Sequence, residues 1–350
     1  MTLKHARRWA ALGALTALTC IGPGVFAQSQ PQPPMPPVKS PDPDAPDAPT
    51  VQIGNGRATA LIYMPDPERG YYRATRFDWS GAIANLTVDG HSYFGRWFAK
   101  YDPKIHDSVP GPVEHFTSGQ GADFANPGET YVQIGVGILI KPRVAPTSTM
   151  PTFDIADPGK WTTHVHGDSV EFIHEVNDPS SGYGYRYTKT VSLPPGRAQM
   201  VISHRLESTG DRVIDTELYD HNFFVIDHQT SGPDFDVSFP FTPHMTTPRG
   251  AIEVRGKSIA YTKLFTDPSD RGGGRMRGWG KTAADFKVTV ANHKTGAAVT
   301  MTADQPLTNF NLFTTPTVVA PEMYMHVHAE KEHPMVWTFV YDFKASPPEP

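Results

Sequence analysis

Four consecutive polar residues, Tyr219-Asp220-His221-Asn222, interrupt an otherwise largely apolar stretch between residues 213 and 227. Many of the flanking residues are β-branched or aromatic, which is typical of a β-strand. Burying a carboxylate, an imidazole and an amide costs about 1–3 kcal/mol each unless they are paired. Two interpretations stay open: a hydrogen-bonded structural cluster at a strand end, or a histidine held for proton transfer at the floor of a cleft.

A second candidate for proton transfer is Glu322, which follows a proline in the segment 314–324. The segment is largely apolar, and partial desolvation would raise the pKa of the carboxyl above its ordinary value of about 4.3 and make it a useful base. The alternative is an exposed carboxylate in a loop. If Glu322 and His221 face a common cleft with room for a ligand between them, a carboxylate base and an imidazole acid are available to that ligand.

Two aromatic-rich segments contain residues that could bind a substrate. Arg76 and Trp79 lie in the run 73–81, where a guanidinium could hold hydroxyls or a carboxylate and an indole could stack. The same run could instead be a turn in which Asp78 pairs with an arginine. His115 belongs to a Gly- and Pro-rich segment of interleaved aromatic and polar residues, which is typical of the edge of a sugar site.

Two H-x-H sequences, His164-Val165-His166 and His326-Val327-His328, could each place two imidazoles on one face of a strand and raise the hypothesis of a cupin-like metal enzyme. The second half of the cupin motif does not follow, since an arginine stands after the P-P-G turn at 194–196 where a histidine is required. No nucleotide-binding or nucleophile motif is present, and the glycine-rich run 271–280 is interpreted as a mobile basic loop. We therefore expect no metal and no cofactor.

The composition excludes several classes of protein. The chain has 350 residues and a formal charge of −5, and no long run of Lys or Arg, so nucleic acid is not an expected partner. Its 35 prolines and 30 glycines favour many turns and short strands over long helices. Alternating or strongly apolar runs such as 82–88, 131–140 and 170–176 are separated by turn residues. This pattern predicts an all-β protein, a large antiparallel β-sandwich.

Residues 1–27 are typical of a secretory signal peptide. Basic residues precede an apolar run at 10–19, and Val25-Phe26-Ala27 fits a cleavage site. The apolar run is shorter than the ~20 residues that span a membrane, so no membrane span is expected. The single cysteine, Cys20, is lost with the signal peptide unless it carries a lipid, an alternative that stays open. We expect a periplasmic or secreted bacterial protein.

The remaining terminal segments differ in composition from the body. Residues 28–50 are rich in Pro, Asp and Gln and predict an extended, disordered tether. The tail at 346–350 is similar. The folded domain is expected at 51–345, and the sequence does not determine its oligomeric state.

The order of these features resembles the aldose 1-epimerase, or galactose mutarotase-like, superfamily. The match rests on the P-P-G turn at 194–196 followed by V-I-S-H-R-L-E-S-T-G and D-H-N-F-F, on the late T…P-E segment that ends at Glu322, and on the closing W-x-x-x-Y-x-F at 337–343. The resemblance implies the galactose mutarotase-like supersandwich. It also implies a mono- or oligosaccharide partner, with His221 as general acid and Glu322 as catalytic base.

The activity that the resemblance implies is interconversion of sugar anomers by an exported carbohydrate-active protein. Glu322 would take the proton of the anomeric hydroxyl, and His221, oriented by Asp220, would protonate the ring oxygen. The residues expected to hold the sugar are Arg76, Trp79 and His115.

Two other functions within the same superfamily stay open. One is a carbohydrate-binding protein without turnover. The other is a polysaccharide lyase, in which Tyr219 or His221 removes a proton next to a uronate carboxylate held by Arg73 or Arg76.

Overall fold

The computed structural model describes residues 38–345, so the expected signal peptide, the first part of the tether and the tail lie outside the described residues. Within this range the chain forms antiparallel β-sheets and two short 3-10 helices, η1 (Ile226–His228) and η2 (Ala283–Asp285), and no α-helix. The predicted all-β antiparallel sandwich is confirmed.

The largest sheet has ten strands. They are β9 (Lys160–Val165), β10 (Ser169–Asp178), β11 (Tyr183–Ser192), β12 (Gln199–Ser208), β14 (Phe235–Ser238), β16 (Ile252–Arg255), β17 (Ser258–Tyr261), β19 (Lys287–Asn292), β20 (Ala297–Ala303) and β23 (Met335–Ala345). Their spatial order is β16-β17-β14-β19-β20-β23-β12-β11-β10-β9. Side chains alternate between buried and more exposed positions along the long strands, so one face of this sheet covers the core.

Three smaller sheets complete the described fold. The six-stranded sheet has the order β15-β18-β21-β22-β13-β5. In the other two sheets the strands lie in sequence order, β1-β2-β3-β4 and β6-β7-β8. Their strands are β1 (Thr50–Gly54), β2 (Ala58–Tyr63), β3 (Ile83–Val88), β4 (His91–Phe94), β5 (Val113–Phe116), β6 (Thr130–Gln133), β7 (Gly137–Ile140), β8 (Ile155–Asp157), β13 (Ile214–His221), β15 (His244–Met245), β18 (Gly272–Arg277), β21 (Asn309–Thr315) and β22 (Val318–Ala329).

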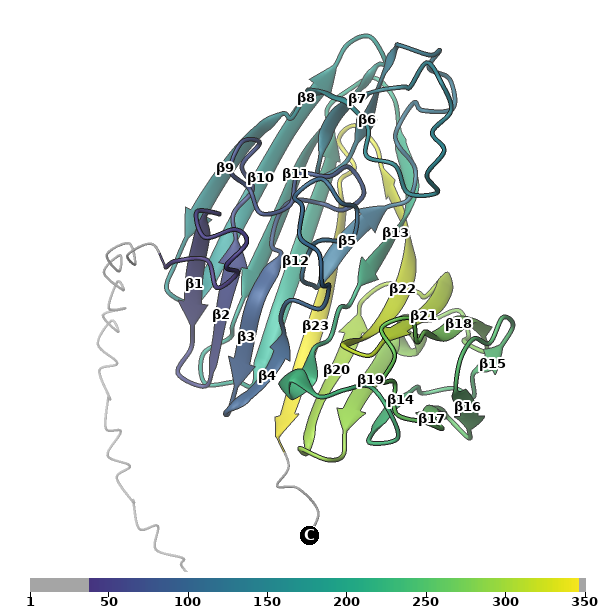
Figure 1. Ribbon diagram of the computed structural model, residues 1–350. Coiled ribbons are helices and arrows are strands. Elements are labelled where there is room, and N and C mark those ends of the chain that lie inside the picture. The colour runs from purple at the N-terminus through teal and green to yellow at the C-terminus, as the bar shows by residue number, and fades with distance from the viewer. Residues whose placement is uncertain (1–37, 346–350) are drawn as a thin grey trace, which may run out of the picture. The chain divides into compact units, whose positions relative to one another are not determined.

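The four-stranded and six-stranded sheets lie together against the core face of the ten-stranded sheet (Figure 1). The core between the layers contains buried apolar side chains from all three sheets, including Ile62, Tyr187, Leu218, Met323 and Phe339. Each large apolar side chain buried in this way contributes about 1.5–3 kcal/mol. A second apolar cluster, which includes Phe77, Trp79 and Phe223, contacts the outer side of the six-stranded sheet.

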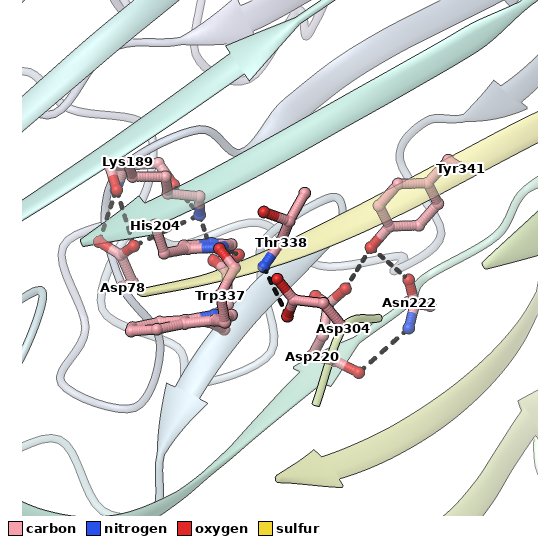
Figure 2. Close-up of polar contacts among 11 residues, drawn as sticks. Asp78, Lys189, His204, Asp220, Asn222, Asp304, Trp337, Thr338 and Tyr341 are labelled. Atoms are coloured by element: carbon pink, nitrogen blue, oxygen red, sulfur yellow. Dashed lines mark hydrogen bonds and ion pairs between the residues drawn. The ribbon is translucent and has the colours of Figure 1, made fainter. Parts of the chain in front are cut away.

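A polar network lies inside the sandwich (Figure 2). The ammonium group of Lys189, on β11, contacts the carboxylates of Glu114 on β5 and Asp78, the latter at 3.3 Å. The second oxygen of Glu114 lies 3.0 Å from Nε2 of His204. Burial alone would raise the pKa of Glu114, but Lys189 and His204 lower it to about 2. The network therefore pairs charges that would be very unfavourable in the core if left alone.

One predicted strand is interrupted. The apolar run 131–140 forms two strands, β6 and β7, which pair with each other across a turn at 134–136. Gly135 has a φ of +77°, and a Cβ at this position would lie 2.7 Å from the Asp78 side chain. The turn therefore needs glycine, and the residue lets the backbone approach the buried carboxylate.

The end of the expected tether is packed against the sandwich. Asp42 is 5% exposed and accepts a hydrogen bond of 2.7 Å from Nη1 of Arg96, and the Tyr71 hydroxyl also contacts it. Ala48 is buried, and Thr50 begins β1. An extended tether was expected over all of 28–50, and for residues 38–50 the structure differs, because the Asp42 carboxylate is the partner of a guanidinium and a buried hydroxyl.

We expect Lys189→Met to destabilise the protein by about 3–5 kcal/mol, because it leaves Glu114 and Asp78 as uncompensated charges in the core. Urea denaturation measures the change. Lys160→Met is the matched control: this lysine is 75% exposed on β9 and pairs with Glu175 at the surface, so little change is expected. Equal effects of the two substitutions would contradict a stabilising role for the buried pair.

Candidate functional site

Strand register places several of the candidate residues on one face of the six-stranded sheet. His221 on β13 pairs with Glu322 on β22, and Tyr219 pairs with Tyr324 on β22 and His115 on β5. Residues directly opposite each other in an antiparallel pair point to the same side of the sheet, and residues two apart in a strand share a face. All five side chains therefore lie on the same face.

A cavity of about 630 Å³ opens on this face. Its walls include Arg76, Tyr219, Asn311, Phe313 and Tyr324. Among the described residues that line it, Glu322 supplies the only carboxylate. The cavity lies within the range of about 300–1,000 Å³ typical of small-ligand sites, and it combines aromatic walls with a few polar groups.

Glu322 lies at the floor of the cavity and is 7% exposed. Its Oε2 accepts a hydrogen bond of 3.3 Å from the Tyr324 hydroxyl, and its Oε1 lies 3.3 Å from Nε2 of His221. Burial raises the pKa of Glu322, and the Asn311 side chain and Arg76 offset only part of that effect. A carboxyl with a raised pKa that contacts a cavity is a more effective proton acceptor than an exposed glutamate.

His221 lies behind Glu322 and not across a ligand from it. The imidazole is 3% exposed, stacks on Phe223 with ring centroids 3.8 Å apart, and meets Phe77 and Phe313 edge-on. Burial lowers its pKa well below the ordinary value, so the ring is neutral. The structure brings His221 and Glu322 together as expected, but a separation of 3.3 Å leaves no room for a pyranose between them.

Arg76 and His115 converge on Tyr219. Nη2 of Arg76 donates a hydrogen bond of 2.7 Å to the Tyr219 hydroxyl, and Nη1 pairs with Asp107. Nδ1 of His115 lies 3.0 Å from the same hydroxyl. Packing around its ring and the nearby guanidinium lower the pKa of His115. Arg76 contacts the cavity directly, as expected, whereas His115 supports it through Tyr219.

Trp79 and Asp220 do not reach this cavity. The Trp79 indole donates a hydrogen bond of 2.8 Å to the Ala74 carbonyl, stacks near Trp161, and lines a separate cavity. Asp220 alternates with His221 along β13 and points to the opposite face, where its carboxylate contacts the Tyr341 hydroxyl (Figure 2). The orientation of the His221 ring by Asp220 is therefore not found, because neighbours in a strand face opposite ways.

Several residues of the cavity were not identified from the sequence as site residues, among them Asn311, Phe313, Tyr324, Arg249, Arg271 and Arg275. The period-2 pattern of 309–313 marks a strand, but nothing local indicates which face meets a ligand. Arg275 belongs to the glycine-rich run that we interpreted as a mobile loop. That interpretation is wrong, because residues 272–277 form β18 and pair with β21.

The H-x-H pairs lie away from the cavity. His326 and His328 are exposed on β22 and contact the Asp215 carboxylate at 3.0 and 2.8 Å, and His164 and His166 are exposed near the end of β9. Between residues 38 and 345, no group of three or more His, Cys, Asp or Glu side chains is arranged to hold a metal ion. The same part of the chain has no helix long and apolar enough to cross a bilayer.

Comparison with solved structures identifies the fold. The chain is similar to a galactose mutarotase-like protein from Clostridium acetobutylicum, with a TM-score of 0.52, 10% identity, and coverage of 85% of this chain and 96% of that one. A protein from Synechocystis sp. gives a TM-score of 0.51 at 11% identity, over 91% of this chain and 99% of that one. A putative aldose 1-epimerase from Escherichia coli gives 0.49 at 10% identity, over 85% and 99%.

The chain therefore has the galactose mutarotase-like fold, and the resemblance inferred from the sequence is confirmed at the level of the fold. No protein-family profile matches the sequence, and neither does any curated protein.

We expect the His221 imidazole to stay neutral in NMR titration at pH values well below the ordinary histidine pKa of about 6.5, since burial disfavours its charged form. His328 is the internal control, because hydrogen bonds from Asp215 and Glu330 raise its pKa. Signals are assigned by comparison with His221→Asn and His328→Asn. Titration of His221 at or above the ordinary value would show that its ring is hydrated and not sealed behind Glu322.

Proposed function

We propose that this chain acts on a saccharide and interconverts its anomers, with Glu322 as the group that exchanges a proton with the anomeric hydroxyl. The observation that carries the proposal is a nearly buried carboxyl with a raised pKa at the floor of an aromatic-walled cavity. The fold of galactose mutarotase-like proteins supports a sugar as the ligand. Aromatic rings suit the C–H faces of a pyranose, and amides and guanidinium groups suit its hydroxyls.

The reaction needs an acid as well as a base. Glu322 takes the proton of the anomeric hydroxyl, the bond between the anomeric carbon and the ring oxygen breaks, and the ring oxygen receives a proton. Rotation about the C1–C2 bond and reclosure give the other anomer, and both protons return to their donors. No cofactor is consumed, because the substrate and product are isomers.

Tyr219 fits the role of the acid better than His221, which we expected from the sequence. The Tyr219 side chain lines the cavity, while the imidazole of His221 is covered by Phe223 and Glu322. Burial raises the pKa of Tyr219, so its hydroxyl carries a proton that it can donate. The Arg76 guanidinium, which already donates to the Tyr219 hydroxyl, would stabilise the phenolate formed. In this scheme His221 positions the Glu322 carboxylate.

A second candidate activity is elimination on a uronate polymer. The Tyr219 hydroxyl contacts both Arg76 and His115, and such a phenol could remove a proton next to a carboxylate. The raised pKa of Tyr219 favours the first proposal, because a base must lose its proton before it acts.

Export to the periplasm or beyond is also part of the proposal. It rests on the signal-peptide pattern of residues 1–27 alone.

We expect Glu322→Gln to lower the rate of anomer interconversion by about 10²–10⁴-fold, the usual contribution of one positioned acid–base group. Polarimetry on a pure anomer measures the rate, and circular dichroism verifies folding. Glu171→Gln, which alters a carboxylate of β10 outside the cavity, is the matched control. A Gln variant as fast as the wild type would remove Glu322 from the mechanism. If the wild type and the Glu322→Gln variant both bind a saccharide and neither interconverts its anomers, the chain is a carbohydrate-binding protein.

The rate should fall at low pH as Glu322 gains a proton. Because burial raises the pKa of this carboxyl, its ionised form is present only above that raised value, and the fall begins at a higher pH than for an exposed glutamate. Asn311→Leu removes a side chain that lowers the Glu322 pKa, so the acid limb of kcat/KM should move to still higher pH. An acid limb unchanged in this variant would assign it to another group.

A further inference from the structure

We propose that the saccharide is anionic and that three arginines at the edge of the cavity, Arg249, Arg271 and Arg275, bind its carboxylate, sulfate or phosphate group. We call these three residues the arginine rim. The inference deepens the proposed function and rests on it for the saccharide, whereas the negative charge of the ligand follows from the cavity itself. All three rim residues line the same cavity as Glu322.

Strand register aligns one rim residue with the proposed base. Arg275 on β18 pairs with Asn311 on β21, and Asn311 pairs with Glu322 on β22. The three side chains form one row on the same face of the sheet. Two strand spacings of ~4.8 Å place Arg275 about 10 Å from Glu322, which is enough for a sugar ring and a charged substituent between them.

Glycines in β18 let the segment that carries Arg249 come close to this strand. Gly273 exchanges backbone hydrogen bonds with Arg249, at 2.9 and 3.2 Å. Gly274 has a φ of +132°, and a Cβ there would lie 1.9 Å from the Thr247 carbonyl oxygen. The segment that carries Arg249 therefore lies directly on the backbone of β18, beside Arg271 and Arg275.

The rim residues lack partners of opposite charge within the protein. Across residues 38–345, no carboxylate lies within 4.0 Å of any of the three guanidinium groups. Arg271 donates only to the backbone carbonyls of Pro268 and Asp270. Other surface arginines of the chain, such as Arg57 and Arg205, do pair with carboxylates. Three unpaired cations around one cavity are unexpected in a chain whose formal charge is −5.

A fourth guanidinium, that of Arg76, also lines the cavity but pairs with Asp107, so the three rim cations face Glu322 as the single carboxylate of the cavity lining. Clustered like charges repel one another unless an anion lies among them. Guanidinium groups bind carboxylate, sulfate and phosphate oxygens through paired hydrogen bonds. A neutral sugar would leave this charge uncompensated, whereas a saccharide with one or more acidic substituents would neutralise it.

The test is calorimetric titration of three oligosaccharide types, carboxylated, sulfated and phosphorylated, each against a neutral oligosaccharide of equal length. The combined variant Arg249→Gln, Arg271→Gln, Arg275→Gln is compared with Arg57→Gln, Arg205→Gln, Arg255→Gln, which removes the same charge outside the cavity. Loss of hydrogen bonds to a charged group predicts roughly 10–100-fold weaker binding of at least one anionic type by the rim variant. The control variant should bind as the wild type does, and added salt should weaken anionic binding.

Equal affinity for neutral and anionic oligosaccharides, or a rim variant that binds as tightly as the control, would overturn the inference. So would equally tight binding of a short single-stranded oligonucleotide, which would show a surface for polyanions in general. Glu322→Gln separates the two proposals. If this variant still binds the anionic oligosaccharide, but neither it nor the wild type interconverts anomers, the anionic ligand is supported and the proposed reaction is wrong. An unsaturated product formed from the carboxylated oligosaccharide would support the anionic ligand and would show that the reaction is elimination and not anomer interconversion.

Discussion

The arrangement of the site depends on the buried ion pairs that the ammonium group of Lys189 forms with Glu114 and Asp78. The ammonium group lies between the layers with Glu114 and Asp78, and all three side chains are at most 1% exposed. An ammonium group in this position is tolerable only when its partners reach it with good geometry, so the contact constrains where β5 and the segment around Asp78 can lie. Both partners are one or two residues from a residue at or near the cavity: Glu114 precedes His115, and Asp78 follows Arg76 by two.

Side chains alternate between the two faces of a strand, so the residues that fix β5 and β13 in the interior also fix their neighbours on the cavity face. Glu114 and Asp220 point into the sandwich, while their neighbours His115 and Tyr219 point to the cavity face. In the polar sequence Tyr219-Asp220-His221, the side chains of Tyr219 and His221 therefore lie on one face of the sheet and that of Asp220 on the other. Asp220 belongs to a structural cluster with Tyr341 (Figure 2), and Tyr219 lines the cavity on the other face. The interpretation as a hydrogen-bonded structural cluster holds for Asp220 and Asn222.

The polar residues that line the cavity come from two parts of the six-stranded sheet, its centre and one edge. The centre of the sheet carries the two groups that we propose as acid and base, since Tyr219 and Glu322 lie on the adjacent strands β13 and β22. The edge supplies the arginine rim, through β18 and the segment at 246–249 that lies on it. We propose that this edge, and not the fold shared with galactose mutarotase-like proteins, sets the charge of the ligand.

Local pattern in the sequence was sufficient for the fold class, because period-2 alternation and turn residues are properties of neighbouring positions. The strands at 170–176 and 336–343 were recognisable from such patterns. Register, exposure and the partners of each polar group depend on residues distant in the chain, and these only the tertiary structure decided. It placed His221 behind Glu322, turned Asp220 and Trp79 away from the cavity, and formed a strand from a glycine-rich run. It also packed Asp42 against Arg96, because a charged side chain settles where its counter-charge lies, and no spacing along the chain records that position.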